Sequence, residues 1–439
     1  MKKITVIVLL GLYSISCPAQ LLDRIKNRVE QKVVDQIDHS IDKATEKKKQ
    51  KDKPGTPDSS GTQTQSEPQP TSTSTTTSPE PATPAVAATT GREGDITSYS
   101  KFDFVAGSKI IMHEDFSQDE VGDFPANWNT RSGAELVNVA GSNMKWLRMN
   151  QDGVFYPEYL NSDLPEHFTL QLKLMANKDV SNIGEFMISL IEAKDTDQKF
   201  AWGEASHISA PSFKITFQPT SSDKGDLKYS TNLIGSLYKH GVPEFNTNKT
   251  SVNVSIWRQK QRVRVYLDST KVLDLPRALD PGALLNTLVF SSDNPDFNQK
   301  GGAFFLSDIR LAVGAADTRN KLVTEGKFVT HGILFDTNSE KIQPQSYGTL
   351  KDIAQVLQEN AALRIQIVGH TDTDGNEQAN VDLSKRRAAA VRNALVSTFG
   401  INDSRMETDG KGQSQPVDTN DTPVGKANNR RVELIKLDN

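Results

Sequence analysis

Polar and charged side chains of the types that bind ligands gather near the C-terminal end of the chain. They are His370, Thr371, Asp372, Asp374, Asn380 and Arg387. His370, Asp372 and Asp374 alternate as metal ligands can. A calcium loop that began at Asp372 would need glycine at its sixth position and glutamate at its twelfth. These positions hold Glu377 and Leu383, and we therefore expect neither a metal ion nor a cofactor at this cluster.

Arg387 falls within the apolar stripe of a predicted helix. At 100° per residue it shares one side with Leu383, Val391 and Ala394. A guanidinium in such a stripe needs a partner, because unpaired burial of its charge is costly, and Asp372 is the nearest plausible carboxylate. Two interpretations stay open. The pair forms an internal salt bridge, or it flanks a small zwitterion, with the guanidinium binding a carboxylate and the aspartate binding an ammonium.

Alternating strands and helices must position these side chains. The expected order is a strand at Ile333–Phe335, a helix from Tyr347 to Leu357, a strand from Leu363 to Ile367, a helix at Leu383–Leu395 and a strand at Arg431–Leu437. This pattern predicts a βαβ-type α/β domain over residues 325–439. Asp372 then follows the second strand, and Arg387 lies on the second helix.

Five motifs mark this region. They are Phe335-Asp336-Thr337-Asn338-Ser339, Gly369-His370-Thr371-Asp372, Asn380 with Leu383-Ser384-x-x-Arg387-Ala388, Gly410-x-Gly412-x-x-x-Pro416, and Asn429-Arg430-Arg431-Val432. In these residues the chain resembles the OmpA-like peptidoglycan-binding domain, which outer-membrane protein A, peptidoglycan-associated lipoprotein and flagellar stator proteins share. The resemblance spans Phe328 to Leu437.

The resemblance implies that Asp372 and Arg387 bind diaminopimelate of the cell-wall stem peptide, whose far end carries both an ammonium and a carboxylate. It implies that five further residues line the pocket: Thr371, Asn380, Asp336, Thr337 and Asn338. We expect Arg430 and Arg431 to stabilise the fold, with Arg431 also able to lie near the site. Lys411 and Gln413 depart from the family pattern, in which an aromatic residue and an acid are commoner, and the pocket is expected to stay intact.

Residues 100–318 are predicted to be all-β. Apolar side chains alternate at 168–174, 186–190, 213–217 and 263–267, and turn residues separate these runs. A two-sheet sandwich or jelly roll fits this length. The region also loosely resembles the concanavalin-like and laminin-G-like jelly rolls of secreted bacterial proteins. This resemblance rests on four segments: Glu114-Asp115-Phe116-Ser117, Val121-Gly122-Asp123-Phe124-Pro125, the strand pair 262–275 with a turn at Lys271-Val272-Leu273-Asp274, and Phe305-Leu306-Ser307-Asp308-Ile309-Arg310.

This second resemblance implies that the sandwich binds a glycan or a protein. Some such domains hold calcium between their first and last strands, where Asp115 and Asp308 would be the ligands. Calcium needs six to eight oxygen ligands, and two aspartates do not supply them. We therefore expect Asp115 and Asp308 to be acidic residues at strand ends without a calcium site. An alternative makes the sandwich a carbohydrate-active enzyme with paired carboxylates. Its candidates are Glu185, Glu192, Glu204 and the nearby His207, and no pair among them stands out.

The N-terminal quarter carries signals for export. Residues 1–19 have Lys2 and Lys3, an apolar run and small residues, as in a signal peptide. Cleavage after Ala19 would remove Cys17, the only cysteine, whereas lipidation would retain Cys17 as the first residue. Residues 20–53 predict an amphipathic helix, and residues 54–99 a disordered Pro/Thr/Ser linker.

Composition agrees with this division of the chain. Only 36% of the 439 residues are hydrophobic, and the linker and the charged helix account for much of that deficit. The net charge of −4 argues against a nucleic-acid partner. The sequence thus predicts a multidomain, non-enzymatic envelope protein of a Gram-negative bacterium, at the periplasmic face of the outer membrane. It would bind peptidoglycan noncovalently and display the sandwich. The alternative is a carbohydrate-active enzyme tethered to the wall.

Overall fold

The computed structural model describes residues 102–438, except 161, 178–182, 297–300 and 315–316. Residues 88–439 form one compact unit, and all described residues belong to it. The predicted signal peptide (1–19), amphipathic helix (20–53) and linker (54–99) all lie outside the described residues. None of the helices in the described ranges has both the length and the apolar content to cross a membrane.

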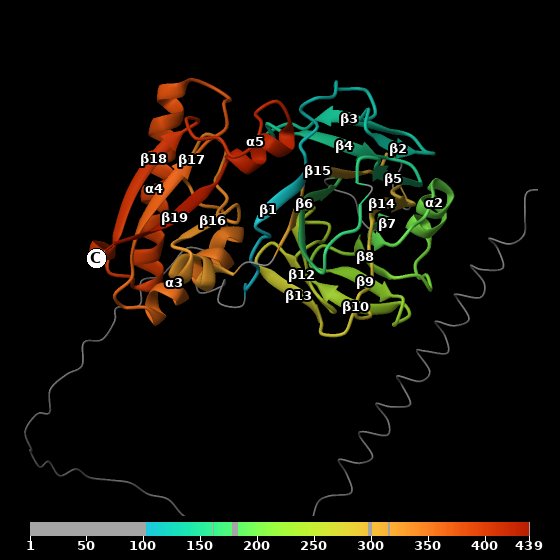
Figure 1. Cartoon of the computed structure of the whole chain (residues 1–439). Helices are drawn as coiled ribbons and strands as arrows, with labels where there is room; N and C mark the ends of the chain where they lie inside the picture. Colours follow the sequence, from blue (N-terminus) through green and yellow to red (C-terminus); the bar gives the residue numbers. More distant parts are fainter. Residues whose placement is uncertain (1–101, 161, 178–182, 297–300, 315–316, 439) are drawn as a thin grey trace, which may run out of the picture. The chain divides into compact units, whose positions relative to one another are not determined.

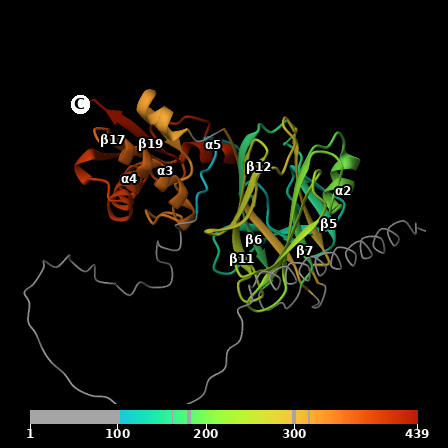
Figure 2. The same cartoon turned by 90° about the horizontal axis from the view of Figure 1, so that it is seen from below.

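The central region consists of two antiparallel sheets (Figures 1 and 2). Sheet A contains, in spatial order, β13 (Thr270–Leu275), β12 (Arg262–Leu267), β11 (Ser251–Gln259), β6 (His167–Ala176), β15 (Phe304–Val313), β4 (Lys145–Met149) and β3 (Ala134–Asn138), with β1 (Lys109–Glu114) paired to β15. Sheet B contains β10 (Leu237–Val242), β9 (Gly225–Thr231), β8 (Ser212–Pro219), β7 (Glu185–Ile191), β14 (Thr287–Asp293), β5 (Gly153–Pro157) and β2 (Trp128–Thr130). The prediction of an all-β central region is confirmed.

One apolar core lies between the two sheets. Alternate residues of a strand point to the same face, and the predicted alternating side chains are buried together. Leu170 and Leu174 of β6 in sheet A belong to the same core cluster as Ile188 of β7 and Ile215 of β8 in sheet B. The two layers therefore form a sandwich. Its resemblance to the concanavalin-like and laminin-G-like jelly rolls stays a prediction.

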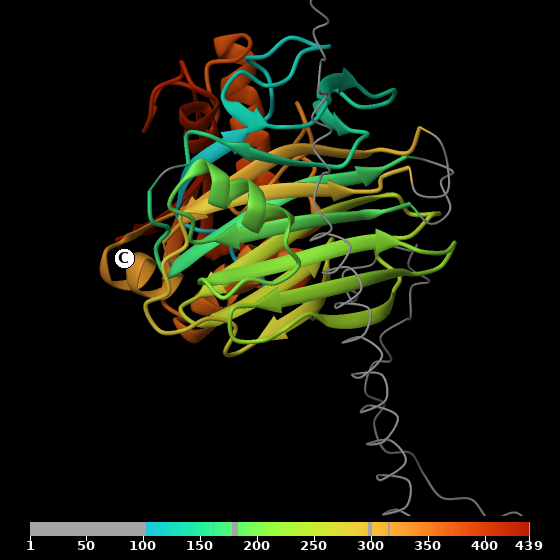
Figure 3. The same ribbon diagram turned by 90° about the vertical axis from the view of Figure 1, so that its right-hand side faces the viewer.

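Two local features of the sandwich differ from the sequence-based expectation. A helix that the strand pattern did not indicate, α2 (Thr196–Glu204), lies over the outer face of sheet B (Figure 3). Asp195 caps its first turn by accepting a hydrogen bond from the Gln198 N–H. The predicted turn at 271–274 is wrong, because these residues belong to β13. The chain instead turns before β13, where Asp268 has a φ of 49°.

The C-terminal domain has a four-stranded sheet in the order β16 (Lys327–Thr330), β19 (Val432–Leu437), β17 (Arg364–His370) and β18 (Met406–Gly412). Only β17 and β18 run parallel. The helices are α3 (Tyr347–Glu359), α4 (Glu377–Phe399) and α5 (Pro423–Asn429), with short turns of helix at Asn320–Thr324, Pro344–Ser346 and Asp403–Arg405. The predicted strand at 333–335 is wrong. Phe335 makes only an isolated bridge to Ile342, and the strand lies at β16.

Helix α5 packs against β1 of the sandwich (Figure 1). The Asn428 side chain accepts a hydrogen bond from the Ile110 N–H at 3.1 Å and donates one to the Ile110 carbonyl at 3.0 Å. Ile110, Ala312 and Ala427 form a small buried apolar cluster beside these bonds. The α/β domain is therefore joined to the edge of sheet A by both polar and apolar contacts.

Candidate functional site

The predicted site lies where β17 ends and α4 begins. Helix α4 packs on β17 and β18 through a buried stripe of Asn380, Ser384, Ala388, Val391 and Leu395. This close packing requires glycine in the strand, because a Cβ added at Gly369 would lie 2.3 Å from the carbonyl oxygen of Ser384. Gly369 thus allows α4 to approach β17 closely. The loop that follows places Asp372 just beyond the C-terminal end of β17.

The Asp372 carboxylate is buried and held by two groups. Its Oδ2 forms an ion pair with Nη1 of Arg430, and its Oδ1 accepts a hydrogen bond from the Asp374 N–H at 3.1 Å. The Thr371 hydroxyl donates to the Asp372 carbonyl at 2.8 Å. Arg430, which the sequence assigned only to the stability of the fold, therefore lies at the site as the partner of Asp372.

Asn380 holds the backbone of the same loop. Its side-chain amide donates to the carbonyl of Asp374 at 3.0 Å and to that of Asp372 at 3.3 Å. It also lies 2.8 Å from Oε1 of Gln413. Gln413, at a position where the sequence departs from the family pattern, is thus a neighbour of a predicted pocket residue. Asn380 is 6% exposed, so its main contacts serve to fix the loop that carries Asp372.

Arg387 is half-buried on α4 and has a different set of contacts. Its Nε donates to the Ser339 carbonyl at 3.0 Å, and its guanidinium lies 4.9 Å from the centre of the Phe335 ring. Burial lowers the pKa of Arg387, and the Arg430 charge lowers it further, whereas Asp372 opposes the shift. Among the ion pairs of the described residues, Arg387 has no carboxylate partner. The internal salt bridge between Asp372 and Arg387 is not formed.

The loop of Asp336, Thr337 and Asn338 positions Arg387 through its backbone. Asn338 has a φ of 53°, and the Ser339 N–H donates to the Asp336 carbonyl at 3.1 Å. Asparagine tolerates this left-handed conformation better than most residues. The turn directs the Ser339 carbonyl to Arg387, while the Asp336 carboxylate pairs with Lys341 at 3.2 Å on the surface.

Arg431 and His370 belong to a buried network on another side of the sheet. The Arg431 guanidinium pairs with Glu433 at 2.8 Å, and Lys327 binds the same carboxylate at 2.8 Å. His370 Nε2 lies 3.6 Å from Glu433. Asp374 pairs instead with Lys426 at 2.7 Å. Within the described part of the chain, no group of three or more His, Cys, Asp or Glu side chains could hold a metal ion.

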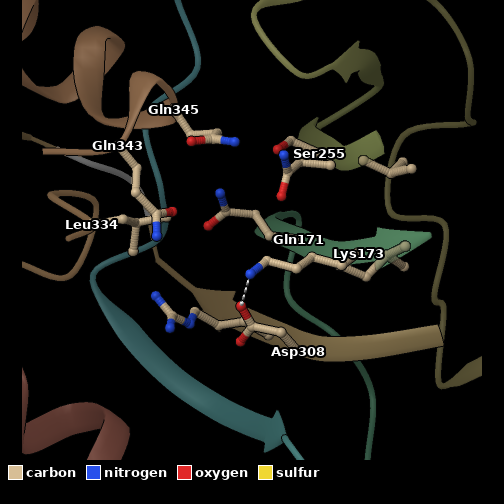
Figure 4. Close-up of a pocket in the computed structure, with 11 residues that line it drawn as sticks. Gln171, Lys173, Ser255, Asp308, Leu334, Gln343 and Gln345 are labelled. Atoms are coloured by element: carbon tan, nitrogen blue, oxygen red, sulfur yellow. Dashed lines mark ion pairs between the residues drawn. The ribbon is translucent and has the colours of Figure 1, made fainter. Parts of the chain in front are cut away.

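The candidate residues of the sandwich have separate partners. Asp308 pairs with His113 at 3.1 Å and Lys173 at 3.8 Å, while Asp115 accepts a hydrogen bond from the Ser117 N–H. Asp308 and Lys173 face a small polar cleft with a volume of about 30 Å³, which has room for about two water molecules (Figure 4). Glu185, a candidate of the enzyme alternative, pairs with Lys228 at 2.7 Å.

The α/β domain thus carries a buried carboxylate, Asp372, and a half-buried cation, Arg387, that do not form an ion pair with each other. The domain's family follows from comparison with known proteins, because residues 334–430 match the OmpA family. The chain carries an OmpA-family domain at its C-terminus, as the motifs predict.

Three relatives have similar sequences. The chain is 34% identical over 145 residues to Probable lipoprotein YiaD of Escherichia coli (strain K12), which covers 30% of this chain and 64% of that protein. It is 39% identical over 101 residues to Outer membrane porin F of Pseudomonas aeruginosa, a match that covers 23% of this chain and 29% of that protein. It is 37% identical over 108 residues to Peptidoglycan-binding protein ArfA of Mycobacterium bovis, a match that covers 24% of this chain and 33% of that protein. The chain thus spans less than two thirds of each of these relatives.

Proposed function

We propose that this protein is a non-enzymatic anchor of the cell envelope that binds peptidoglycan noncovalently through its OmpA-family domain. The OmpA family match and the relatives named for peptidoglycan binding, the outer membrane and a lipoprotein support the anchoring role and the envelope location. The ligand we propose is diaminopimelate of the stem peptide. The sandwich is displayed to bind a glycan or a protein.

One observation carries the proposal. Asp372 lies in the loop between β17 and α4 and Arg387 lies on α4, yet they do not pair with each other, and Arg387 lacks a carboxylate partner among the ion pairs of the described residues. A half-buried guanidinium without a counter-ion is costly, and a ligand carboxylate would lower that cost. The Asp372 carboxylate has further lone pairs for an ammonium. A zwitterion such as the far end of diaminopimelate supplies both groups.

Sedimentation with purified diaminopimelate-type peptidoglycan tests the proposal. In the full chain, Arg387→Ala and separately Asp372→Ala should lower retention by about tenfold or more, because each removes one half of a charge-assisted contact. Arg387→Lys should also bind more weakly, since a lysine cannot form the two parallel hydrogen bonds of a guanidinium.

The matched control is Arg386→Ala. Arg386 is the next residue on α4, and its side chain is 51% exposed and pairs with Glu340 on the surface. Its removal should leave retention unchanged. Thermal unfolding of each variant separates loss of binding from loss of folding. If both site variants are retained like the unmodified protein, diaminopimelate is not bound at this pair.

A further inference from the structure

A chain of polar side chains runs from the sandwich to the predicted peptidoglycan site. Oδ1 of Asp308 on β15 lies 3.1 Å from Nε2 of His113 on β1. Nδ1 of His113 lies 3.5 Å from Nη2 of Arg430. Nη1 of the same guanidinium forms the ion pair with Asp372. One arginine thus contacts the sandwich with one amino group and the site with the other.

The hydrogen-bonding capacity of these groups assigns the tautomer of His113. A carboxylate only accepts hydrogen bonds, so Nε2 of His113 carries the proton that it donates to Asp308. In the singly protonated ring Nδ1 is then an acceptor. Its partner is Nη2 of Arg430 at 3.5 Å, which only donates, and not the carbonyl oxygen of Pro423, which lies 3.4 Å from the same nitrogen. The His113 side chain is 4% exposed, so its surroundings hold the ring in this orientation. In this way Asp308 fixes His113, and His113 offers Arg430 an acceptor at a defined position.

Asp308 has an unusual backbone conformation that serves this contact. Its φ is 49°, and the pairing of β15 with β6 shifts register between Ser307 and Arg310. Such a bulge re-aims a side chain, and positive φ in a residue other than glycine is retained where the surrounding structure enforces it, often at functional positions. Burial opposes ionisation of Asp308, but His113, Arg310 and Lys173 hold its pKa well below the ordinary value.

The position of Arg430 is also fixed along the chain. The side chain of Asn428, two residues before it, makes two hydrogen bonds to the backbone of Ile110 on β1 and donates a third to the Asp418 carboxylate at 2.9 Å. His331 Nε2 lies 3.0 Å from the Asn428 carbonyl and braces the same end of α5. Arg430 therefore leaves α5 at a point that the sandwich determines.

We propose that His113 of the sandwich is a positioning residue of the peptidoglycan site. By binding one amino group of Arg430, it limits that arginine to a single contact with Asp372, which leaves the remaining lone pairs of the carboxylate for the ammonium of the ligand. Without His113, Arg430 is free to pair with Asp372 through both amino groups and to compete with the ligand. This inference rests on the proposed function, and it makes the sandwich a part of the wall site.

A double-mutant cycle in the full chain tests the proposal, with affinity for purified diaminopimelate-type peptidoglycan as the measurement. His113→Leu should weaken binding by about five- to tenfold in the otherwise unmodified protein. In the Arg430→Ala background the same change should alter affinity by less than about twofold, because His113 then has no arginine to position. Equal losses in both backgrounds, or no loss in either, would overturn the proposal.

A conservative variant distinguishes positioning from folding. In His113→Asn, the side-chain oxygen can replace Nδ1 as the acceptor for Arg430, so binding should stay within about twofold of the unmodified protein. If His113→Leu fails to fold, His113→Phe, which keeps a ring but offers no acceptor to Arg430, takes its place in the cycle with Arg430→Ala. Loss of binding in His113→Asn without loss of folding would count against it.

Two controls complete the experiment. His207→Leu removes an exposed histidine of the sandwich, and its binding should be unchanged. Arg387→Ala separates the two hypotheses. Unchanged binding in this variant and in Asp372→Ala refutes the proposed function, whereas lost binding in both with unchanged binding in His113→Leu refutes only the role of His113.

Discussion

Buried His331 should make the stability of the protein depend on pH in the mildly acidic range. Its Nε2 donates to the Asn428 carbonyl, and its Nδ1 is buried with no hydrogen-bond partner. Burial lowers the pKa of His331 from 6.5 to about 4. The pKa is lower in the folded state than in the unfolded state, so the neutral ring contributes stability above pH 6.5, and this stability is lost as the pH falls toward 4.

The size of the effect follows from the shift. A difference of about 2.5 pKa units corresponds to about 3 kcal/mol of unfolding free energy between pH 6.5 and pH 4. Urea unfolding of the full chain at several pH values measures it. His331→Leu, which cannot titrate, should lose about 3 kcal/mol less than the unmodified protein over this range. His207→Leu, a change at an exposed histidine, should not alter the profile. Parallel profiles for the unmodified protein and His331→Leu would refute the reasoning.

Two further predictions concern buried charges. Glu433→Gln should destabilise the protein by about 3 kcal/mol at pH 7, because Arg431 keeps its charge in the core. Burial opposes ionisation of Glu433, but His370, Lys327 and Arg431 depress its pKa. The ionised carboxylate therefore stabilises the folded protein above pH 4.5, and this stabilisation is lost in acid. Urea unfolding should show both effects, and Glu407→Gln, at an exposed pair, should change little. Lys214 donates to two carbonyls at the end of α2, and burial lowers its pKa from 10.5 to about 7. Stability should therefore rise between pH 7 and pH 10, and Lys214→Met should abolish that rise while Lys224→Met retains it. A rise that persists without Lys214 would assign it to another group.

The strands of the sandwich were predictable because one face of each is apolar. Strand β18 was not predictable in this way, since its sequence from Met406 to Gly412 has few apolar side chains. Its burial depends on glycine: a Cβ at Gly410 would lie 2.3 Å from the Lys385 backbone nitrogen on α4. The apolar run at 333–335 suggested a strand, but its backbone turns back to bridge Ile342.

The predicted site had the correct loop and helix but an incomplete set of charges. Asp372 and Arg387 were found because one follows a strand and the other interrupts an apolar stripe. Arg430 and Arg431 are adjacent and of the same type, so spacing alone does not separate them. Tertiary packing does, since Arg431 turns inward to Glu433 and Arg430 turns to Asp372. The sequence did offer one sign that a second arginine belongs to the site, because the motifs contain more arginines than carboxylates.

The two hydrogen bonds between Asn428 and Ile110 also protect an edge of the sandwich. A strand edge with free N–H and C=O groups is a template on which another chain can add a strand. At Ile110 both groups are taken by one side-chain amide, and α5 covers this part of β1. Displacing α5 would expose the edge to a neighbouring molecule, either to its strands or to its own α5 in a domain-swapped dimer. The residue that joins the two domains thus also blocks strand addition at Ile110.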